Sequence, residues 1–318
     1  MSTLAVAHPH QASEPAGASS TTPAAPTTFT LGVNTASLAG YSLEESLRIA
    51  AVLGFQAVEL LAFEGATHSQ GELAGIWFND LDTAGKDRLL HLLEPFPRRS
   101  LHAPFKDAPL LTYNKRTRES AIAQVQETID LAAFIGATAI ATHANPRNTL
   151  PIDSFWPELL DVYRRLGDYA LAHGAGVKLG VETGYPEDAP TFARLVREID
   201  HPAVGATIDV GHVRGCVPKE RWGTPEGVAE LNDHIEYLLT TLGLGDKVVH
   251  FHIHDIRRSD FRDHRALGNL ADNGVIDFPR LLTQLTHSPY TGLWILELEE
   301  PDRQESLFRS RDYLSSLP

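Results

Sequence analysis

The chain has 318 residues, of which 41 are acidic and 27 are Lys or Arg, so its formal net charge is −14. This balance disfavours binding along a nucleic-acid backbone, which draws its affinity from clustered Lys and Arg. The single cysteine, Cys216, excludes an intrachain disulfide framework and a thiolate-rich zinc site, and it fits a reducing, cytoplasmic location. No run approaches the roughly 18 apolar residues that span a bilayer, so we expect no membrane-spanning helix.

The first 28 residues differ in composition from the rest. They are rich in Ala, Ser, Thr and Pro and contain no Lys or Arg. A secretory signal needs a basic start and a continuous apolar stretch, and a mitochondrial presequence needs arginine. We therefore predict a disordered tail over residues 1–28, because this segment buries too little apolar surface to offset its ordering entropy.

Beyond the tail, short apolar runs alternate with stretches of helical apolar spacing. Strands are predicted at 31–33, 56–61, 99–102, 137–142, 177–182, 203–209, 247–252 and 293–297. Helices are predicted at 42–53, 86–93, 116–134, 156–172, 191–199, 227–242 and 278–285. The first of these helices begins with a capping box, because Glu45 follows Ser42 by three residues.

Eight strands alternating with helices favour an α/β fold, a (β/α)₈ TIM barrel forming one domain over residues 29–318. Such a barrel needs about 250 residues, which this chain can supply. A doubly wound open sheet is the competing architecture. It would place a Gly-rich turn after the first strand, whereas residues 32–35 read Gly-Val-Asn-Thr.

Six of the predicted strands end in, or are followed at once by, a side chain that binds metals well. These side chains are His102, His143, Glu182, Asp209, His252 and Glu297. The C-terminal ends of barrel strands meet at one mouth, where such barrels keep their chemistry. Three imidazoles and three carboxylates converging there indicate a divalent metal site, of Mn²⁺, Zn²⁺, Co²⁺ or Mg²⁺.

Two further patterns narrow the choice of ligands. In the strand at 247–252, His250, His252 and His254 share a face because side chains alternate along a strand; His252 is the preferred ligand, since His254 already falls in the following loop. Carboxylates buried without partners are costly, and a cation removes that cost. Ion pairs with Arg or Lys of neighbouring loops are the alternative explanation of the carboxylates.

Several of these segments resemble the xylose-isomerase-like barrel superfamily. They are Ser-Leu-His-Ala-Pro-Phe at 100–105, Gly-Val-Glu-Thr at 180–183, Ile-Asp-Val-Gly-His at 208–212, Phe-His-Ile-His-Asp at 251–255 and Gly-Val-Ile-Asp-Phe at 274–278. The superfamily holds sugar and sugar-phosphate isomerases and epimerases, inosose-pathway enzymes and the endonuclease IV type of abasic-site nuclease. The resemblance covers residues 31–299.

For the isomerase branch, the resemblance implies one divalent metal held by Glu182, Asp209, His252 and Glu297. It also implies that the two glutamates move protons as acid and base, while the metal stabilises an enediolate. The substrate would be a small sugar or sugar phosphate, and the sequence is compatible with a homo-oligomer.

For the nuclease branch, the resemblance implies two or three zinc ions in a phosphodiesterase that acts on abasic DNA. His102, His143, His212 and His264 match further ligands of that branch. The pattern also departs from it, because the branch expects an Asp two residues before the last of these histidines and position 262 is Arg. The Gly-rich run expected after residue 268 is interrupted too.

In an isomerase, the same histidines, His102, His143, His212 and His264, would contact substrate oxygens or orient the metal ligands. Lys106, just after the third strand, is a candidate for binding a substrate phosphate. Solvation is the competing explanation for a charged loop residue. A third reading, a barrel that binds a sugar or a metal without catalysis, is disfavoured because both glutamates are present.

Overall fold

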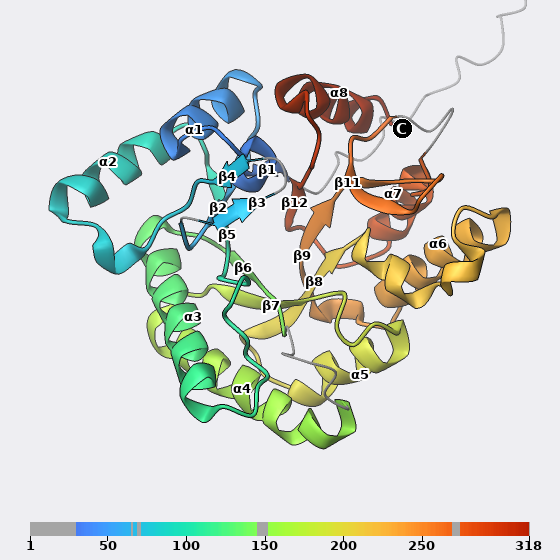
Figure 1. The fold of residues 1–318 in the computed structure, drawn as a ribbon, viewed down its shortest axis with the longest axis horizontal. Coiled ribbons are helices and arrows are strands. Elements are labelled where there is room, and N and C mark those ends of the chain that lie inside the picture. The colour runs from blue at the N-terminus through green and yellow to red at the C-terminus, as the bar shows by residue number, and fades with distance from the viewer. Residues whose placement is uncertain (1–29, 65, 69–70, 145–151, 269–273, 318) are drawn as a thin grey trace, which may run out of the picture.

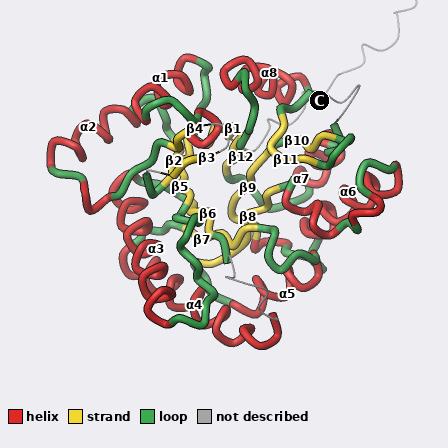
Figure 2. The backbone as a smooth tube through the Cα atoms, viewed as in Figure 1, coloured by secondary structure: helices red, strands yellow, loops and turns green. Residues whose placement is uncertain are grey.

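In the computed structural model, which describes residues 30–64, 66–68, 71–144, 152–268 and 274–317, eight parallel strands close into a barrel surrounded by helices (Figures 1 and 2). Around the barrel the strands follow the order β1-β12-β9-β8-β7-β6-β5-β2. Their bounds are β1 Thr30–Asn34, β2 Ala57–Leu61, β5 Arg98–His102, β6 Ala139–Thr142, β7 Lys178–Glu182, β8 Val204–Asp209, β9 Val248–Ile253 and β12 Leu293–Leu296. The predicted TIM barrel is confirmed, whereas the predicted tail over 1–28 lies outside the described residues.

The helices follow the strands in turn. They are α1 Leu43–Val52, α2 Thr83–Leu93, α3 Lys115–Ile135, α4 Ile152–His173, α5 Ala189–Ile199, α6 Pro225–Leu239, α7 Phe278–Thr286 and α8 Arg303–Ser316. The capping box at Ser42 and Glu45 is present. Helix α8 was not predicted, and α6 ends three residues earlier than expected. None of the described helices is both long and apolar enough to cross a membrane.

Two short antiparallel hairpins stand apart from the barrel sheet, and neither was predicted. Strands β3 Ala66–His68 and β4 Gly71–Leu73 pair in the connection between β2 and α2. Strands β10 Asp255–Arg257 and β11 Arg262–Arg265 pair directly after β9. The second hairpin carries His264 back toward the mouth of the barrel, where its backbone N–H donates to His254 Nδ1 at 2.9 Å.

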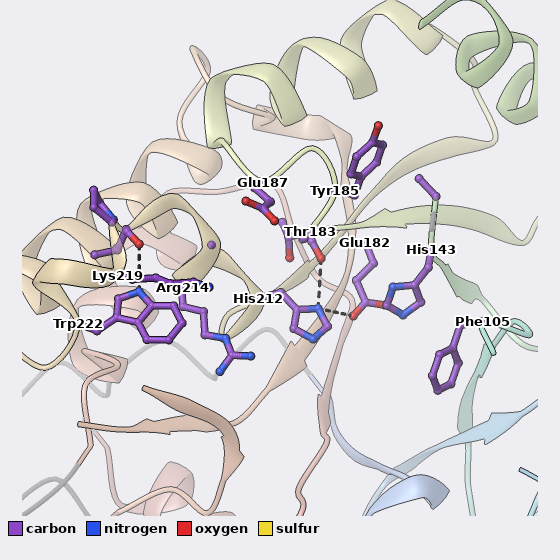
Figure 3. Close-up of a pocket in the computed structure, with 15 residues that line it drawn as sticks. Phe105, His143, Glu182, Thr183, Tyr185, Glu187, His212, Arg214, Lys219 and Trp222 are labelled. Carbon is purple, nitrogen blue, oxygen red and sulfur yellow. Dashed lines mark hydrogen bonds and ion pairs between the residues drawn. The ribbon is translucent and has the colours of Figure 1, made fainter. Parts of the chain in front are cut away.

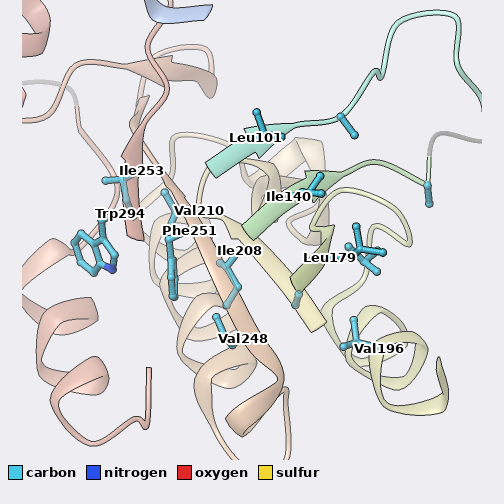
Figure 4. Close-up of a cluster of buried hydrophobic side chains, with 14 of the residues drawn as sticks. Leu101, Ile140, Leu179, Val196, Ile208, Val210, Val248, Phe251, Ile253 and Trp294 are labelled. Carbon is cyan, nitrogen blue, oxygen red and sulfur yellow. The ribbon is translucent and has the colours of Figure 1, made fainter. Parts of the chain in front are cut away.

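Alternation along the strands separates an apolar outer layer from a barrel interior that carries polar side chains above a small apolar cluster of Ala57, Leu293 and Ile295. The side chains packed beneath the helices belong to one apolar cluster that includes Leu101, Ile140, Leu179, Ile208, Phe251 and Trp294 (Figure 4). Residues of opposite parity point into the barrel, so Glu59 of β2 meets His250 of β9 at 2.6 Å although these strands are not neighbours. Polar contacts therefore cross the barrel interior.

Gly205 allows β8 and β9 to approach closely where their register shifts, between Ala206 and Thr207. A Cβ at position 205 would overlap the carbonyl oxygen of Lys247 and lie 2.6 Å from Val249. We expect Gly205→Ala to lower the free energy of unfolding by about 1–3 kcal/mol, as overpacking does. Thermal unfolding of the variant measures this effect.

Gly85→Ala is the matched control for that substitution. A Cβ at position 85, in the first turn of α2, would meet side-chain atoms alone, those of Asp82 at 3.2 Å and of Leu81 at 3.4 Å. Its unfolding temperature should stay near or above that of the wild type, because alanine favours a helix over glycine. Equal stability of the Gly205 and Gly85 variants would show that the strands have room to move apart.

Candidate functional site

The mouth of the barrel brings together four side chains from four strand ends. Glu182 and Asp209 are the last residues of β7 and β8, His252 is the last but one of β9, and Glu297 directly follows β12. His252 Nδ1 lies 3.3 Å from Glu182 Oε1, 3.8 Å from Asp209 Oδ2 and 3.0 Å from Glu297 Oε2. One ligand atom from each of the four lies within 4.8 Å of the others, which is the spacing that a shared cation requires.

Burial and neighbouring charges determine the ionisation of these four residues, hereafter called the carboxylate cluster (Glu182, Asp209, His252 and Glu297). Glu182 and Asp209 are buried, and the Glu297 side chain is 17% exposed. Burial raises the pKa of Glu182, but the imidazoles of His143 and His252 hold it well below its ordinary value. Against burial, His252 likewise lowers the pKa of Glu297 to about 2. The carboxylates are therefore ionised at neutral pH.

The polar atoms of the cluster fit a divalent cation. Within the described part of the chain, no donor is aligned to hydrogen-bond Glu182 Oε2 or Glu297 Oε2, although both atoms are buried. Such orphaned carboxylate oxygens are costly unless a cation or another donor meets them. Asp209 is better satisfied, because its Oδ1 accepts from the backbone N–H groups of Gly211 and His212 and lies 2.8 Å from His254 Nε2.

Three histidines that the sequence selected surround Glu182. His143 Nε2 lies 3.1 Å and His102 Nε2 3.6 Å from Glu182 Oε2, and His212 Nδ1 lies 3.2 Å from Glu182 Oε1. Burial lowers the pKa of His212, but Asp209 and Glu182 raise it to about 10. These imidazoles can hydrogen-bond a substrate or bind metal, so the geometry alone leaves both roles open.

His264 and Lys106 occupy different positions relative to the cluster. His264 stacks on His254 with ring centroids 4.2 Å apart, and its Nδ1 lies 3.1 Å from the carbonyl oxygen of Glu297. Lys106 is exposed, its Nζ donates to the carbonyl of Thr67 at 3.3 Å, and it does not line the cavity described below. The structure thus brings His264 to the cluster and leaves Lys106 outside it.

The sequence reasoning assigned no role to several residues that support the cluster. Glu59 lies beneath His252 and is buried, as are Asn34, Ser100 and His250, which contact it. His254, which the sequence predicts to lie in a loop, is buried against Asp209. A glutamate in the middle of an apolar run, as at position 59, was the available signal.

An open cavity of about 570 Å³ leads to the carboxylate cluster (Figure 3). His143, Glu182 and His212 line its inner end, and Arg214, Lys219 and Trp222 line the outer end. Arg214 is paired with Asp263 at 2.8 Å. Lys219 lies over the Trp222 ring at 5.8 Å and forms no ion pair with the described residues. A small polar molecule fits a cavity of this size and lining.

Two other sets of side chains at the mouth have spacing that suits a metal. One consists of His102, Glu182 and His252, and the other of Asp209, His212 and His264. The first set shares Glu182 and His252 with the carboxylate cluster, and the second shares Asp209. A second ion would therefore have to share a carboxylate with the first.

A protein-family model described as xylose isomerase-like TIM barrel matches residues 47–317. Two uncharacterized proteins of Methanocaldococcus jannaschii are each 25% identical to the chain, over 205 and 182 residues. The first match covers 62% of this chain and 63% of the relative, and the second covers 56% and 62%. The chain therefore spans less than two thirds of the length of either relative. An inosose dehydratase of Lactiplantibacillus plantarum is 24% identical over 287 residues, covering 81% of this chain and 82% of that protein.

Solved structures share the fold at lower identity. A D-tagatose 3-epimerase-like protein superposes with a TM-score of 0.66 at 20% identity, covering 90% of this chain and 98% of its own. An IolI protein with a bound zinc atom superposes with a TM-score of 0.64 at 16% identity, covering 90% of this chain and 96% of its own. At these identities the superpositions establish a common architecture.

Proposed function

Because the chain belongs to the xylose isomerase-like TIM barrel family, we propose that it is a metal-dependent isomerase or epimerase acting on a sugar or sugar phosphate. The observation that carries the proposal is the carboxylate cluster, in which two glutamates from different strands flank one imidazole nitrogen. The D-tagatose 3-epimerase-like fold neighbour and the inosose dehydratase relative support a sugar or polyol as substrate.

Glu182, Asp209, His252 and Glu297 are the residues that would hold the metal. When bound, a divalent cation supplies positive charge next to a substrate oxygen on which negative charge develops. Three carboxylates and one imidazole suit Mn²⁺, Zn²⁺, Co²⁺ or Mg²⁺. The zinc atom in the IolI fold neighbour supports this assignment.

Glu182 and Glu297 are the proposed proton carriers. They project from β7 and from the end of β12, which β8 and β9 separate around the barrel, so they can approach a flat substrate from two sides. Both are ionised in the metal-free site, as a base must be before it removes a proton from the carbon next to a carbonyl. Removal by one and return by the other would invert that carbon.

The remaining side chains of the cavity would position the substrate. His102, His143 and His212 place ring nitrogens at the inner end, where sugar hydroxyls can hydrogen-bond them. His264 is proposed to orient the Glu297 segment through that residue's carbonyl. For a phosphorylated substrate, Lys219 at the outer end is better placed than the sequence-selected Lys106, because Lys219 lines the cavity.

Incorporation of solvent deuterium tests the proposed function. The metal-loaded protein is incubated in D₂O with ketoses, their phosphates and inososes, and the products are followed by NMR. An isomerase or epimerase should place deuterium on the carbon next to the carbonyl. Absence of exchange across neutral and phosphorylated ketoses would contradict the proposal.

A zinc-dependent phosphodiesterase acting on abasic DNA is the second candidate. It is favoured by the additional metal-suited sets around His102 and His264. The formal charge of −14 and Arg262, whose guanidinium lies 3.5 Å from Glu299, oppose it. Nicking of an abasic duplex by the zinc-loaded protein would replace the isomerase proposal with this one. A barrel that binds without catalysis would show neither activity.

Metal affinity is expected to rise with pH across the neutral range. Burial lowers the pKa of His252, but the carboxylates of Glu59, Glu182 and Glu297 raise it well above the ordinary value of 6.5. Nδ1 therefore carries a proton at neutral pH in the metal-free protein, and a cation must displace it. We expect release of about one proton and an affinity that tightens about tenfold per pH unit until pH exceeds that pKa.

Calorimetric titration in buffers of different ionisation enthalpy counts the released proton. His91→Gln is the control, because His91 is an exposed helix residue beside Glu94, far along the chain from the cluster. That variant should show the same pH dependence as the wild type. An affinity independent of pH would show that His252 is not the ligand.

A further inference from the structure

Glu59 is a buried carboxylate whose hydrogen-bonding capacity is filled. Its Oε1 lies 2.9 Å from both Asn34 Nδ2 and His252 Nε2. Its Oε2 lies 2.8 Å from Ser100 Oγ and 2.6 Å from His250 Nε2. An ionised carboxylate accepts about four hydrogen bonds and donates none, so all four neighbours must act as donors. Both imidazoles therefore carry their proton on Nε2.

This arrangement determines which nitrogen of His252 faces the carboxylate cluster. With Nε2–H held by Glu59, the opposite ring nitrogen, Nδ1, is the one directed at Glu182 and Glu297. We propose that Glu59 is a positioning residue that keeps the proton on Nε2 of His252 and fixes the ring, so that Nδ1 is the nitrogen that gives up its proton to become the metal ligand. This inference deepens the proposed function, and it rests on the carboxylate cluster being the metal site.

Two observations separate Glu59 from a metal ligand in its own right. Glu59, His250 and His252 have spacing that would suit an ion. However, both Glu59 oxygens already have donors, whereas Glu182 Oε2 and Glu297 Oε2 have none aligned. In addition, Glu59 and His250 are fully buried beneath the mouth, and the cavity reaches Glu182 and not Glu59. Glu59 acts through His252 and does not face the cavity.

Glu59→Gln would keep the size and shape of the side chain but could no longer accept four hydrogen bonds. Its amide nitrogen donates, so one side of the group can no longer accept from a serine or an imidazole N–H. His252 would then lose its fixed proton or its fixed ring orientation. Outer partners of this kind typically contribute 10–100-fold to metal affinity. We expect Glu59→Gln to weaken metal binding by about that factor.

The wild-type protein provides the first test, and a variant is needed only to assign its signals. The chain is labelled with ¹⁵N-histidine and loaded with ¹¹³Cd²⁺, and the His252 signals are assigned by their loss in His252→Asn. We expect cadmium coupling to Nδ1 of His252 and a proton retained on Nε2. Coupling to Nε2, or no cadmium at His252, would overturn the inference.

Affinity measurements with a competing chromophoric chelator supply the second test. Glu59→Gln should bind cadmium and zinc more weakly. The control is Glu94→Gln, an exposed glutamate beside His91, which should bind both metals like the wild type. A folded Glu59→Gln variant with wild-type affinity would overturn the inference. Normal Nδ1 coupling without deuterium exchange into any sugar would instead count against the proposed function and leave the role of Glu59 intact.

Discussion

Glu297→Gln is expected to lower turnover of the ketose substrate by about 10²–10⁴-fold, the usual contribution of a positioned acid or base. Glutamine preserves the size of the side chain but cannot accept a proton from carbon. Glu297 is the more accessible of the two glutamates, and its Oε2 has no aligned donor, so it is placed to meet a substrate. Deuterium exchange and product formation, each at saturating substrate, measure the loss.

The same substitution also removes a candidate metal ligand, so bound metal must be measured on the variant. Glu299→Gln is the matched control: it lies two residues away, and its carboxylate faces Arg262 at 3.5 Å, not His252. The control should retain turnover. Glu297→Gln that keeps its metal and its fold yet turns over at the wild-type rate would remove Glu297 from the mechanism.

The barrel was predictable because its signal is local. Each strand is a short apolar run, and the ends of β7 and β8 at Glu182 and Asp209 were placed to the residue. Helix α8 was missed because its sequence, Arg303–Ser316, is largely polar and lacks a clear apolar stripe. The hairpin β10–β11 was missed because its residues are mostly polar, and its pairing depends on contacts across the turn.

Only part of the site could be predicted from the sequence. The resemblance of segments such as 180–183 and 208–212 to the xylose-isomerase-like barrels is confirmed by the family match over residues 47–317. Convergence of the strand ends follows from the fold, and the structure places the four members of the carboxylate cluster close together. Their roles as ligands or proton carriers remain predictions.

The contacts beneath the cluster were not predictable, because they join strands that are not neighbours in the barrel. Glu59 and His250 are separated by 191 positions in the chain and meet across the barrel interior. His264 has a positive φ of 55° and reaches the mouth only through the turn of the β10–β11 hairpin. Neither position follows from the alternation of a single strand.

Removal of the metal is expected to abolish turnover, and the purified protein should hold about one divalent ion per chain. Glu182 belongs both to the carboxylate cluster and to the set around His102, and Asp209 belongs both to the cluster and to the set around His264. One ion at the carboxylate cluster therefore uses the carboxylates that a second ion would need. Arg262 adds positive charge to the hairpin that carries His264, and this charge disfavours a further ion beside His264.

Two matched substitutions discriminate one metal from three. His252→Asn should lose the ion, whereas His264→Asn should keep it, because His264 lies outside the carboxylate cluster. Elemental analysis after dialysis gives the count for each variant, and deuterium exchange after chelation and metal return gives the activity. If the wild type holds two or three zinc ions and His264→Asn loses one of them, the arrangement with more than one metal is correct. The isomerase assignment would then yield to the phosphodiesterase, since a shared carboxylate between closely spaced ions is the arrangement that stabilises both oxygens of a displacement at phosphorus.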